Sequence, residues 1–101
     1  MVEASAKTLA KTIVELGGAN PIIVCADADL DRAADVVLDS AFSNAGQRCS
    51  SGSRIIIEDS VYDSFRERLL DKAESVSCGI EDDVLISALI DHTSVEHFET
   101  F

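Results

Sequence analysis

The strongest constraint on the fold is an apolar run followed by a stretch of helical periodicity, an order that occurs twice. Residues 21–26 read PIIVCA and residues 54–58 read RIIIE. The continuous apolar run at residues 21–26 is typical of a strand covered on both faces in a parallel sheet, and residues 54–58 predict a further strand. Between them, apolar residues recur at helical spacing from Leu30 to Ala41, and Asp29 stands where a helix cap prefers an acid. The pattern therefore predicts a strand, a helix and a second strand.

A second helix is expected after the second strand. Apolar side chains recur at helical spacing between Tyr62 and Val76, and Ser60 with Asp63 supplies a capping pair. Alternating strands and helices favour an α/β fold, here with a partial sheet of parallel or mixed strands. With 101 residues, the chain is expected to form one small unit with a modest core.

The two ends of the chain carry shorter patterns. Residues 2–10 predict the end of a helix, and residues 12–16 (TIVEL) predict a short strand. Near the other end, Thr93 and Glu96 predict the cap of a final helix that reaches Phe101. Because that helix ends on an apolar residue, we expect its partner surface to lie outside the 101 residues.

Charge excludes several classes of partner. Nineteen acidic against eight basic side chains give a net charge of −11, which repels phosphate, so we expect no binding to nucleic acid or to membrane surfaces. No apolar run approaches the ~18 residues of a membrane span, and the first ten residues lack the apolar centre of a secretory signal. These features predict a cytoplasmic protein.

The cysteines and histidines do not form a recognisable metal or disulfide pattern. Cys25, Cys49 and Cys78 are odd in number and widely separated, without the close pairs of zinc sites or redox loops. His92 pairs with Glu96 on one face of the expected final helix, which provides too few ligands for a metal ion. We expect neither a disulfide framework nor a metal site.

Two residues are candidates for chemistry on their local sequence. Cys49 lies in NAGQRCSSGS (residues 44–53), whose glycines and polar residues give the backbone freedom and donors that a thiolate nucleophile requires, and Arg48 would favour the thiolate. A free thiol in a polar loop is the alternative. Glu15 is an acid between apolar neighbours in the expected strand, where desolvation would suit a general base. An outward-facing strand residue is the alternative there.

Three motifs in this order and spacing resemble the aldehyde dehydrogenase superfamily, whose members use NAD or NADP. They are ELGGANP at residues 15–21, ADADLD at residues 26–31 and FSNAGQRCSSGS at residues 42–53. The resemblance runs through nearly the whole chain and loosens after Cys78. Because members of the family are several times longer, it implies a fragment in which residues 1–18 end the cofactor-binding domain and residues 19–101 begin the catalytic domain.

The resemblance assigns roles to four residues. Cys49 matches the catalytic cysteine, which adds to an aldehyde to form a thiohemiacetal and then a thioester, and its backbone amide would form part of the oxyanion hole. Glu15 matches the general base that activates water to release a carboxylic acid. Leu16 and Gly17 match the backbone segment beside the nicotinamide of NAD or NADP. Cys25 and Cys78 match no catalytic position and are expected to be packing residues.

The resemblance also implies an aldehyde substrate and a homo-oligomer. No dinucleotide-binding fingerprint occurs in the chain, so we expect the 101 residues alone to be inactive as a dehydrogenase. Two alternatives remain open. One is an esterase that depends on Cys49 and needs no cofactor, and the other is a non-catalytic interaction module that associates with itself.

Overall fold

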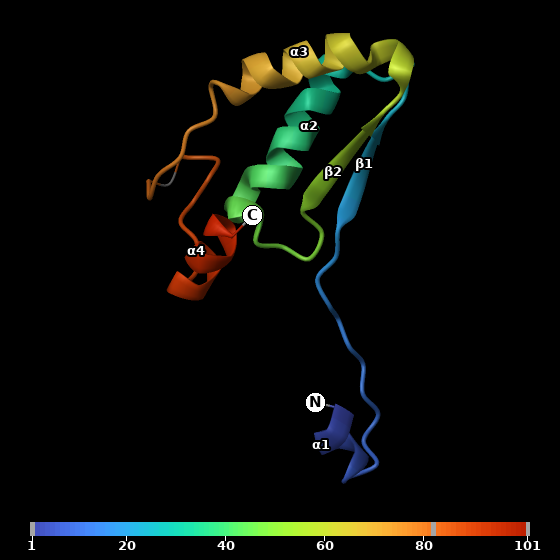
Figure 1. The fold of residues 1–101 in the computed structure, drawn as a ribbon, viewed down its shortest axis with the longest axis vertical. Coiled ribbons are helices and arrows are strands. Elements are labelled where there is room, and N and C mark those ends of the chain that lie inside the picture. The colour runs from blue at the N-terminus through green and yellow to red at the C-terminus, as the bar shows by residue number, and fades with distance from the viewer. Residues whose placement is uncertain (1, 82, 101) are drawn as a thin grey trace.

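The computed structural model describes residues 2–81 and 83–100, and Figure 1 shows its helices and strands. In chain order they are α1 (Val2–Ala6), β1 (Asn20–Val24), α2 (Leu30–Phe42), β2 (Gly52–Ile57), α3 (Tyr62–Ala73) and α4 (His92–Glu99). Short 3₁₀ turns lie before β2 and before α3. The order confirms the predicted α/β alternation.

β1 and β2 form a two-stranded parallel sheet, as the alternation predicted. Val24 at the end of β1 pairs with Ile57 at the end of β2. The register is irregular between Asn20 and Pro21, where β1 begins. α2 is the crossover that joins the two strands, since parallel neighbours cannot be joined by a tight hairpin.

The core lies where the sheet meets α2 and α3. Figure 1 shows α2 beside the sheet and α3 across the end of both. Val24, Ala34, Val37 and Phe65 are buried and pack together, and Phe65 has the largest side chain that is fully removed from solvent. Burial of a side chain such as phenylalanine contributes about 1.5–3 kcal/mol, so these few residues hold the two helices on the sheet.

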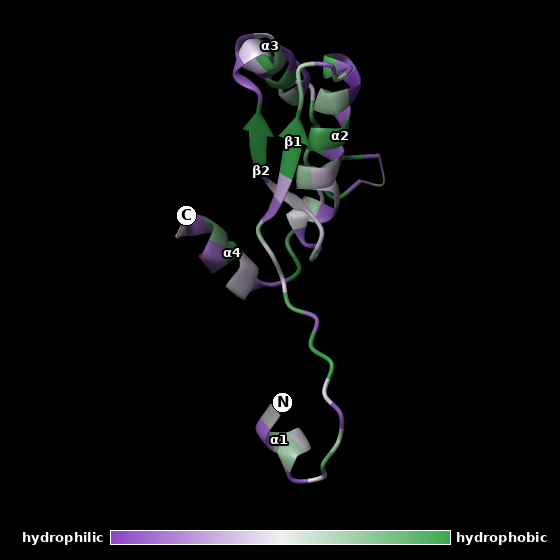
Figure 2. Cartoon of the chain, turned by 90° about the vertical axis from the view of Figure 1, so that its right-hand side faces the viewer, coloured by the Kyte–Doolittle hydropathy of each residue, from purple (hydrophilic) through white to green (hydrophobic). Residues whose placement is uncertain are grey.

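The opposite face of the sheet is open within the described residues, so the prediction that residues 21–26 form a strand covered on both faces is wrong. Ile23 and Ile56 pair across the two strands, and they are 67% and 53% exposed. In Figure 2 the two apolar strands lie in front of α2. Successive side chains of a strand point to opposite faces, and within the described residues the helices cover only one of them.

The segment before β1 also departs from the prediction. Residues 12–16 form no strand, and residues 11–19 are all exposed. The helix expected over residues 2–10 is present but ends at Ala6. A strand needs a neighbour to satisfy its backbone groups, and this segment extends away from the sheet in Figure 1. Its apolar residues therefore have no partner among the described residues.

The caps of α2 and α3 agree only in part with the sequence. Asp29 caps α2 as predicted, and its Oδ1 accepts a hydrogen bond of 3.2 Å from the Arg32 N–H. α3 does not use Ser60 as a cap, because the Ser60 hydroxyl lies 3.4 Å from Glu58 Oε1 and a 3₁₀ turn leads into the helix. The predicted capping pair of α3 is therefore wrong.

The final helix, α4, begins earlier than predicted. Its cap is Asp91, whose Oδ1 accepts from the Ser94 N–H at 2.8 Å, so the assignment of Thr93 as the cap is wrong. Phe101, the predicted end of this helix, lies outside the described residues. Within residues 2–81 and 83–100, no helix has the length and apolar character needed to cross a bilayer.

Candidate functional site

Cys49 occupies the second position of a tight turn that leads into β2. The Ser51 N–H donates to the Arg48 carbonyl at 3.2 Å and closes the turn. The Cys49 thiol is free and exposed. Its backbone N–H donates to no acceptor within residues 2–81 and 83–100. The turn therefore presents a thiol and an unused donor together, the two groups that attack on a carbonyl requires.

Asn20, the first residue of β1, fastens this turn to the sheet. Its side-chain Nδ2 donates to the Cys49 carbonyl at 2.7 Å and to the Ser51 carbonyl at 3.0 Å. Asn20 stands in the motif at residues 15–21, but the sequence predicts no contact for its side chain. Its partners lie 29 and 31 residues away along the chain, so no local pattern reveals these contacts.

A left-handed turn between α2 and the Cys49 turn reverses the chain. Asn44, Ala45 and Gly46 all have positive φ, at 57°, 55° and 70°. At Gly46, an added Cβ would lie 2.9 Å from the Ala41 carbonyl oxygen. Glycine is therefore required there both by its backbone conformation and by the close approach of α2.

Gln47 links the same loop to the segment before α4. Its Nε2 donates to the Ala88 carbonyl at 3.3 Å, and its Oε1 accepts from the Ile90 N–H at 2.8 Å. Arg48 donates to the Ser43 hydroxyl at 2.6 Å. The loop that was expected to give the backbone freedom is thus held by side-chain hydrogen bonds from several sides.

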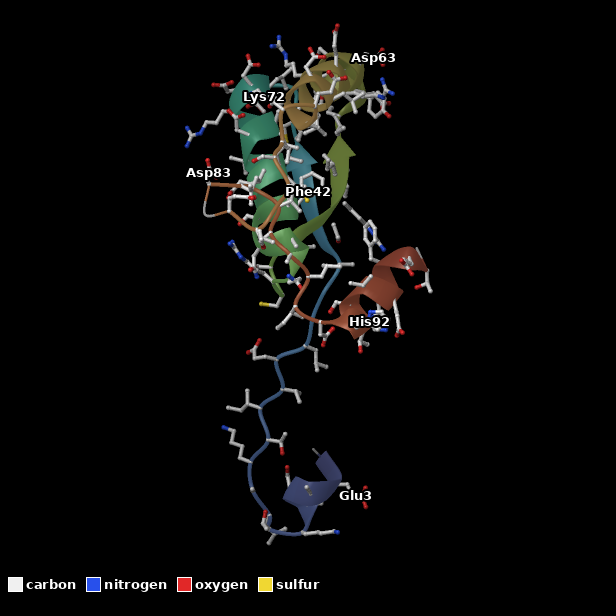
Figure 3. All side chains as sticks on the ribbon, turned by 90° about the vertical axis from the view of Figure 1, so that its left-hand side faces the viewer. Glu3, Phe42, Asp63, Lys72, Asp83 and His92 are labelled. Carbon is white, nitrogen blue, oxygen red and sulfur yellow. The ribbon has the colours of Figure 1, made fainter. Side chains whose placement is uncertain are left out.

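The other predicted site residues lie in the exposed segment before β1. Within the described residues, Glu15 makes no hydrogen bond or ion pair, with Cys49 or with any other group, and the burial expected for its carboxylate is absent. Figure 3 shows the side chains of this segment standing clear of the rest of the molecule. The role of Glu15 stays a prediction.

Leu16 and Gly17 provide at most one edge of a cofactor site. Leu16 is 76% exposed, and no atom lies within 4 Å of the position of a Cβ at Gly17, so a flat ring has room to approach this backbone. The turn from β1 into α2 holds no glycine, so this strand and helix lack the usual cradle for a dinucleotide phosphate. The fit to NAD or NADP is partial, and the remaining contacts would come from outside the 101 residues.

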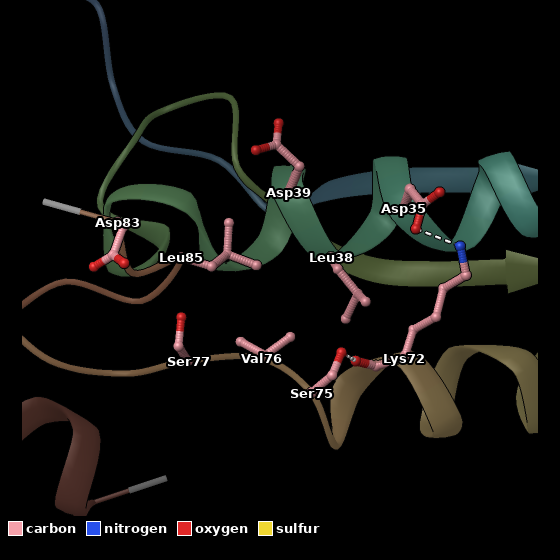
Figure 4. Close-up of a pocket in the computed structure, with 9 residues that line it drawn as sticks. All are labelled: Asp35, Leu38, Asp39, Lys72, Ser75, Val76, Ser77, Asp83 and Leu85. Carbon is pink, nitrogen blue, oxygen red and sulfur yellow. Dashed lines mark hydrogen bonds and ion pairs between the residues drawn. The ribbon is translucent and has the colours of Figure 1, made fainter.

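A mainly apolar cavity of about 480 Å³ lies beside the chain that leads to the Cys49 turn, and Phe42, Ala45 and Cys78 are among the residues that line it. A groove of about 360 Å³ lies between α2, α3 and the chain that follows α3 (Figure 4), and none of the four predicted site residues lines it. Within the described residues, no three His, Cys, Asp or Glu side chains gather to hold a metal ion. His92 and Glu96 share one face of α4, as predicted, with 3.5 Å between Nε2 and Oε1.

Cys25 and Cys78 are free and exposed, so the expectation that they serve as packing residues is wrong. The sequence shows apolar neighbours on both sides of Cys25, but that thiol lies just beyond the buried end of β1. Both thiols are therefore useful internal references for the reactivity of Cys49.

The chain is similar to known proteins over most or all of its length. The model of the aldehyde dehydrogenase family matches residues 1–101. The succinate-semialdehyde dehydrogenase [NADP(+)] of Escherichia coli is 41% identical in an alignment 101 positions long. The alignment covers 98% of this chain and 21% of that protein. The (Z)-2-((N-methylformamido)methylene)-5-hydroxybutyrolactone dehydrogenase of Acinetobacter baylyi is 42% identical over 84 residues, 83% of this chain and 17% of that protein. The chain thus spans about a fifth of the length of these relatives.

Solved structures give the same result for the fold. An NAD-dependent aldehyde dehydrogenase from Sinorhizobium meliloti superposes with a TM-score of 0.91 at 40% identity, over 98% of this chain and 20% of that one. A betaine aldehyde dehydrogenase from Staphylococcus aureus in complex with NAD⁺ superposes with a TM-score of 0.90 at 32% identity, over 98% of this chain and 20% of that one. The arrangement of elements around the Cys49 turn is therefore shared with these enzymes.

Proposed function

The chain belongs to the aldehyde dehydrogenase family, and from this we propose that it carries the nucleophile and the general base of an enzyme that oxidises an aldehyde to a carboxylic acid with NAD or NADP. The observation that supports the proposal is the Cys49 turn, in which an exposed thiol stands beside a backbone N–H without an internal acceptor. Attack of a thiolate on a carbonyl creates an oxyanion, and a preorganised N–H stabilises it.

The proposed chemistry assigns one task to each residue. The Cys49 thiolate forms a C–S bond to the carbonyl carbon, and the carbonyl oxygen becomes an oxyanion that accepts a hydrogen bond from the Cys49 N–H. NAD or NADP supplies the hydride acceptor when it is bound. The Glu15 carboxylate then takes a proton from the water that attacks the thioester. The C–S bond breaks, which releases the carboxylic acid and returns the Cys49 thiolate, and the proton stays on Glu15 until it passes to solvent.

The exposed segment supports the proposed division of the chain. Residues 11–19 link α1 to β1 without regular structure, so a domain boundary after residue 18 falls in a connecting segment. The backbone of Leu16 and Gly17 would border the nicotinamide ring from this segment. A cytoplasmic homo-oligomer is the form we propose for the enzyme, on the family resemblance.

The decisive experiment places the chain in a complete enzyme. Residues 1–101 replace the matching segment of the Escherichia coli succinate-semialdehyde dehydrogenase, and formation of NADPH from succinate semialdehyde is measured. We expect an active hybrid, and we expect Cys49→Ala to lower kcat at least about 10³-fold because it removes the nucleophile. Cys78→Ala is the matched control and should retain the activity of the hybrid. A Cys49→Ala hybrid as active as the control would contradict the proposal.

A second measurement tests the dependence on the rest of the enzyme. The purified 101-residue chain is mixed with NAD or NADP and a panel of aldehydes, and the absorbance of the reduced cofactor is followed. We expect negligible turnover because the chain offers the cofactor only the edge formed by Leu16 and Gly17. Clear cofactor reduction by the chain alone would show that the proposed division of the site is wrong.

A further inference from the structure

We infer that Asn20 is the positioning residue of the Cys49 turn, a role that rests on the proposed function of Cys49 as the nucleophile. One nitrogen, Nδ2, donates to the Cys49 carbonyl at 2.7 Å and to the Ser51 carbonyl at 3.0 Å. Asn20 is itself half-buried; its bond to Ser51 is partly buried and its bond to Cys49 is exposed. Asn20 therefore spans the turn from one side with both of its N–H groups.

The chemistry of this contact explains the residue type. A primary amide nitrogen carries two N–H groups, so it can serve two carbonyl oxygens at once. The isosteric aspartate would place carboxylate oxygens against those carbonyls, where they can only repel them. A serine offers one donor at shorter reach. Among side chains of this size, asparagine is the one that holds both carbonyls.

The two bonds matter because they fix the orientation of Cys49. The peptide plane before Cys49 contains the Arg48 carbonyl. This carbonyl accepts a hydrogen bond of 3.2 Å from the Ser51 N–H, which holds the plane. The peptide plane after Cys49 is held through the Cys49 carbonyl, which accepts from Asn20. With both flanking planes fixed, the φ and ψ angles of Cys49 are fixed as well. The directions of the Cβ–Sγ bond and of the unused N–H then follow.

The same contact attaches the turn to the sheet. Asn20 begins β1, and its own carbonyl accepts from the Ser53 hydroxyl at 3.4 Å. On the other side, the Gly52 N–H donates to the Ser40 hydroxyl of α2 at 3.1 Å. The turn is thus held between β1 and α2, and Asn20 makes the contacts closest to the nucleophile.

The first test measures local order in the 101-residue chain by amide hydrogen exchange, with NMR as the detection method. The Ser51 and Gly52 amides are the reporters because the Ser51 N–H closes the turn and the Gly52 N–H, next to the turn, donates to Ser40 of α2. Loss of two hydrogen bonds should raise their exchange rates about 5- to 30-fold in Asn20→Ala and at least as much in Asn20→Asp. The amides of Val37 and Leu38 in α2 should not change.

The second test asks whether that order serves chemistry at a carbonyl. Acylation by 4-nitrophenyl acetate forms a C–S bond at Cys49 and expels 4-nitrophenolate through an oxyanion, whereas alkylation by iodoacetamide forms no oxyanion. The rates at Cys49, Cys25 and Cys78 are resolved by mass spectrometry of the peptides. In Asn20→Ala, the ratio of the acylation rate to the alkylation rate at Cys49 should fall on the order of tenfold. This is less than the ~10²-fold loss of rate that a ~1 Å misplacement of a catalytic group causes.

The control variant is Ser53→Ala, which removes a neighbouring hydrogen bond of Asn20 but leaves the Cys49 and Ser51 carbonyls held. It should match the wild-type chain in both tests. Unchanged exchange at Ser51 and Gly52 in Asn20→Asp would overturn the inference, and so would equal acceleration in the turn and in α2. If Asn20→Ala loses its helical circular dichroism, Asn20→Ser replaces it, with a smaller acceleration expected because one donor remains.

The two tests also separate this inference from the proposed function. If the wild-type ratio of acylation to alkylation at Cys49 equals the ratios at Cys25 and Cys78, the nucleophile role fails. The exchange rates at Ser51 and Gly52 still decide whether Asn20 orders the turn. If the wild-type ratio is high at Cys49 and does not fall in Asn20→Ala, the nucleophile role stands and the positioning role is overturned.

Discussion

The two segments that carry the proposed catalytic groups differ completely in how they are held. The Cys49 turn is bonded to β1 through Asn20, to α2 through Ser40 and to the segment before α4 through Gln47. The segment of Glu15 has no regular structure, and within the described residues the Glu15 side chain has no partner. One chain therefore contains a proposed nucleophile in an ordered turn and a proposed base without a partner among the described residues.

This difference shows which parts of a site a short stretch of sequence can build. The nucleophile needs an orientation, and hydrogen bonds to nearby elements provide it. A general base of the proposed kind needs partial desolvation, which only a second layer of protein provides. Residues 11–19 are exposed along their whole length, so no layer within the described residues covers Glu15, and the proposed role requires one from elsewhere.

The largest expected effect comes from Glu15→Gln, measured in the hybrid enzyme. Removal of a general base lowers the rate by about 10²–10⁴-fold, so we expect a loss in kcat of this size. The loss should fall on hydrolysis, and acylated Cys49 should accumulate in the hybrid, as detected by mass spectrometry. In the isolated chain the same substitution should leave folding and Cys49 alkylation unchanged, because Glu15 has no partner among the described residues.

The matched control for this prediction is Glu3→Gln, which changes another exposed acid in the same part of the chain. It should retain full activity in the hybrid. Equal losses from Glu3→Gln and Glu15→Gln would point to a general effect of charge. A Glu15→Gln hybrid with unaltered kcat would exclude Glu15 as the base.

Phe65→Ala tests the packing on which the ordered segment depends. Phe65 is fully buried against β1 and α2, and truncation of such a side chain costs about 3–5 kcal/mol. We expect this loss in urea unfolding followed by circular dichroism, and it should also open the Cys49 turn. Phe98→Ala is the control, because Phe98 is 73% exposed and should change the free energy of unfolding little. A similar loss from both variants would contradict the description of the core.

The sequence predicted the core elements well because their signals are local. The apolar run that contains Val24 and the helical spacing around Val37 depend only on neighbours along the chain, and both elements form as expected. The prediction of a strand over residues 12–16 was wrong for a different reason. Its pattern is that of a strand, but a strand also needs a partner, and the described residues supply none.

The candidate site was predictable in its residue types but not in its geometry. The motif around Cys49 predicts a nucleophile there, and the structure gives that residue an exposed thiol and an N–H with no acceptor among the described residues. The contribution of Asn20 was not predictable, because it depends on contacts across 29 and 31 residues. Gln47 was counted as part of a free loop, although its amide bonds to Ala88 and Ile90.

Gly46→Ala and Gly17→Ala compare the two segments directly with one kind of substitution. Gly46 has φ of 70° and would bring its Cβ to 2.9 Å from the Ala41 carbonyl, so we expect a loss of about 1–3 kcal/mol in the free energy of unfolding. Gly17 has open space around its Cβ position, so its substitution should change the free energy by less than about 0.5 kcal/mol. Equal effects in urea unfolding would show that the two segments are equally constrained.

The smallest expected effect concerns pH and the cap of α4, which follows the Gln47 contact at Ile90. Hydrogen bonds from the backbone and side chain of Ser94 lower the pKa of Asp91, with a smaller contribution from His97. A carboxyl whose pKa is lowered by folding stabilises the helix above its unfolded pKa of about 3.9 and loses that contribution as the pH falls through the folded value. We therefore expect the NMR amide signals of α4 to shift toward coil values only below about pH 4.

Asp91→Asn is the matched control for this titration, because asparagine keeps a cap acceptor but does not ionise over this range. Its α4 signals should keep any change caused by Glu96 and Glu99 but lack the part that follows the Asp91 carboxyl. Because the Ile90 N–H donates to Gln47, the Ile90 amide should respond with α4, whereas the amides of residues 11–19 should not follow the titration of Asp91. The contradicting result has two parts: the signals of residues 11–19 change together with those of α4 in the wild-type chain, and this change is absent in Asp91→Asn. Residues 11–19 would then be coupled to α4, and the contrast between them and the hydrogen-bonded Cys49 turn would be wrong.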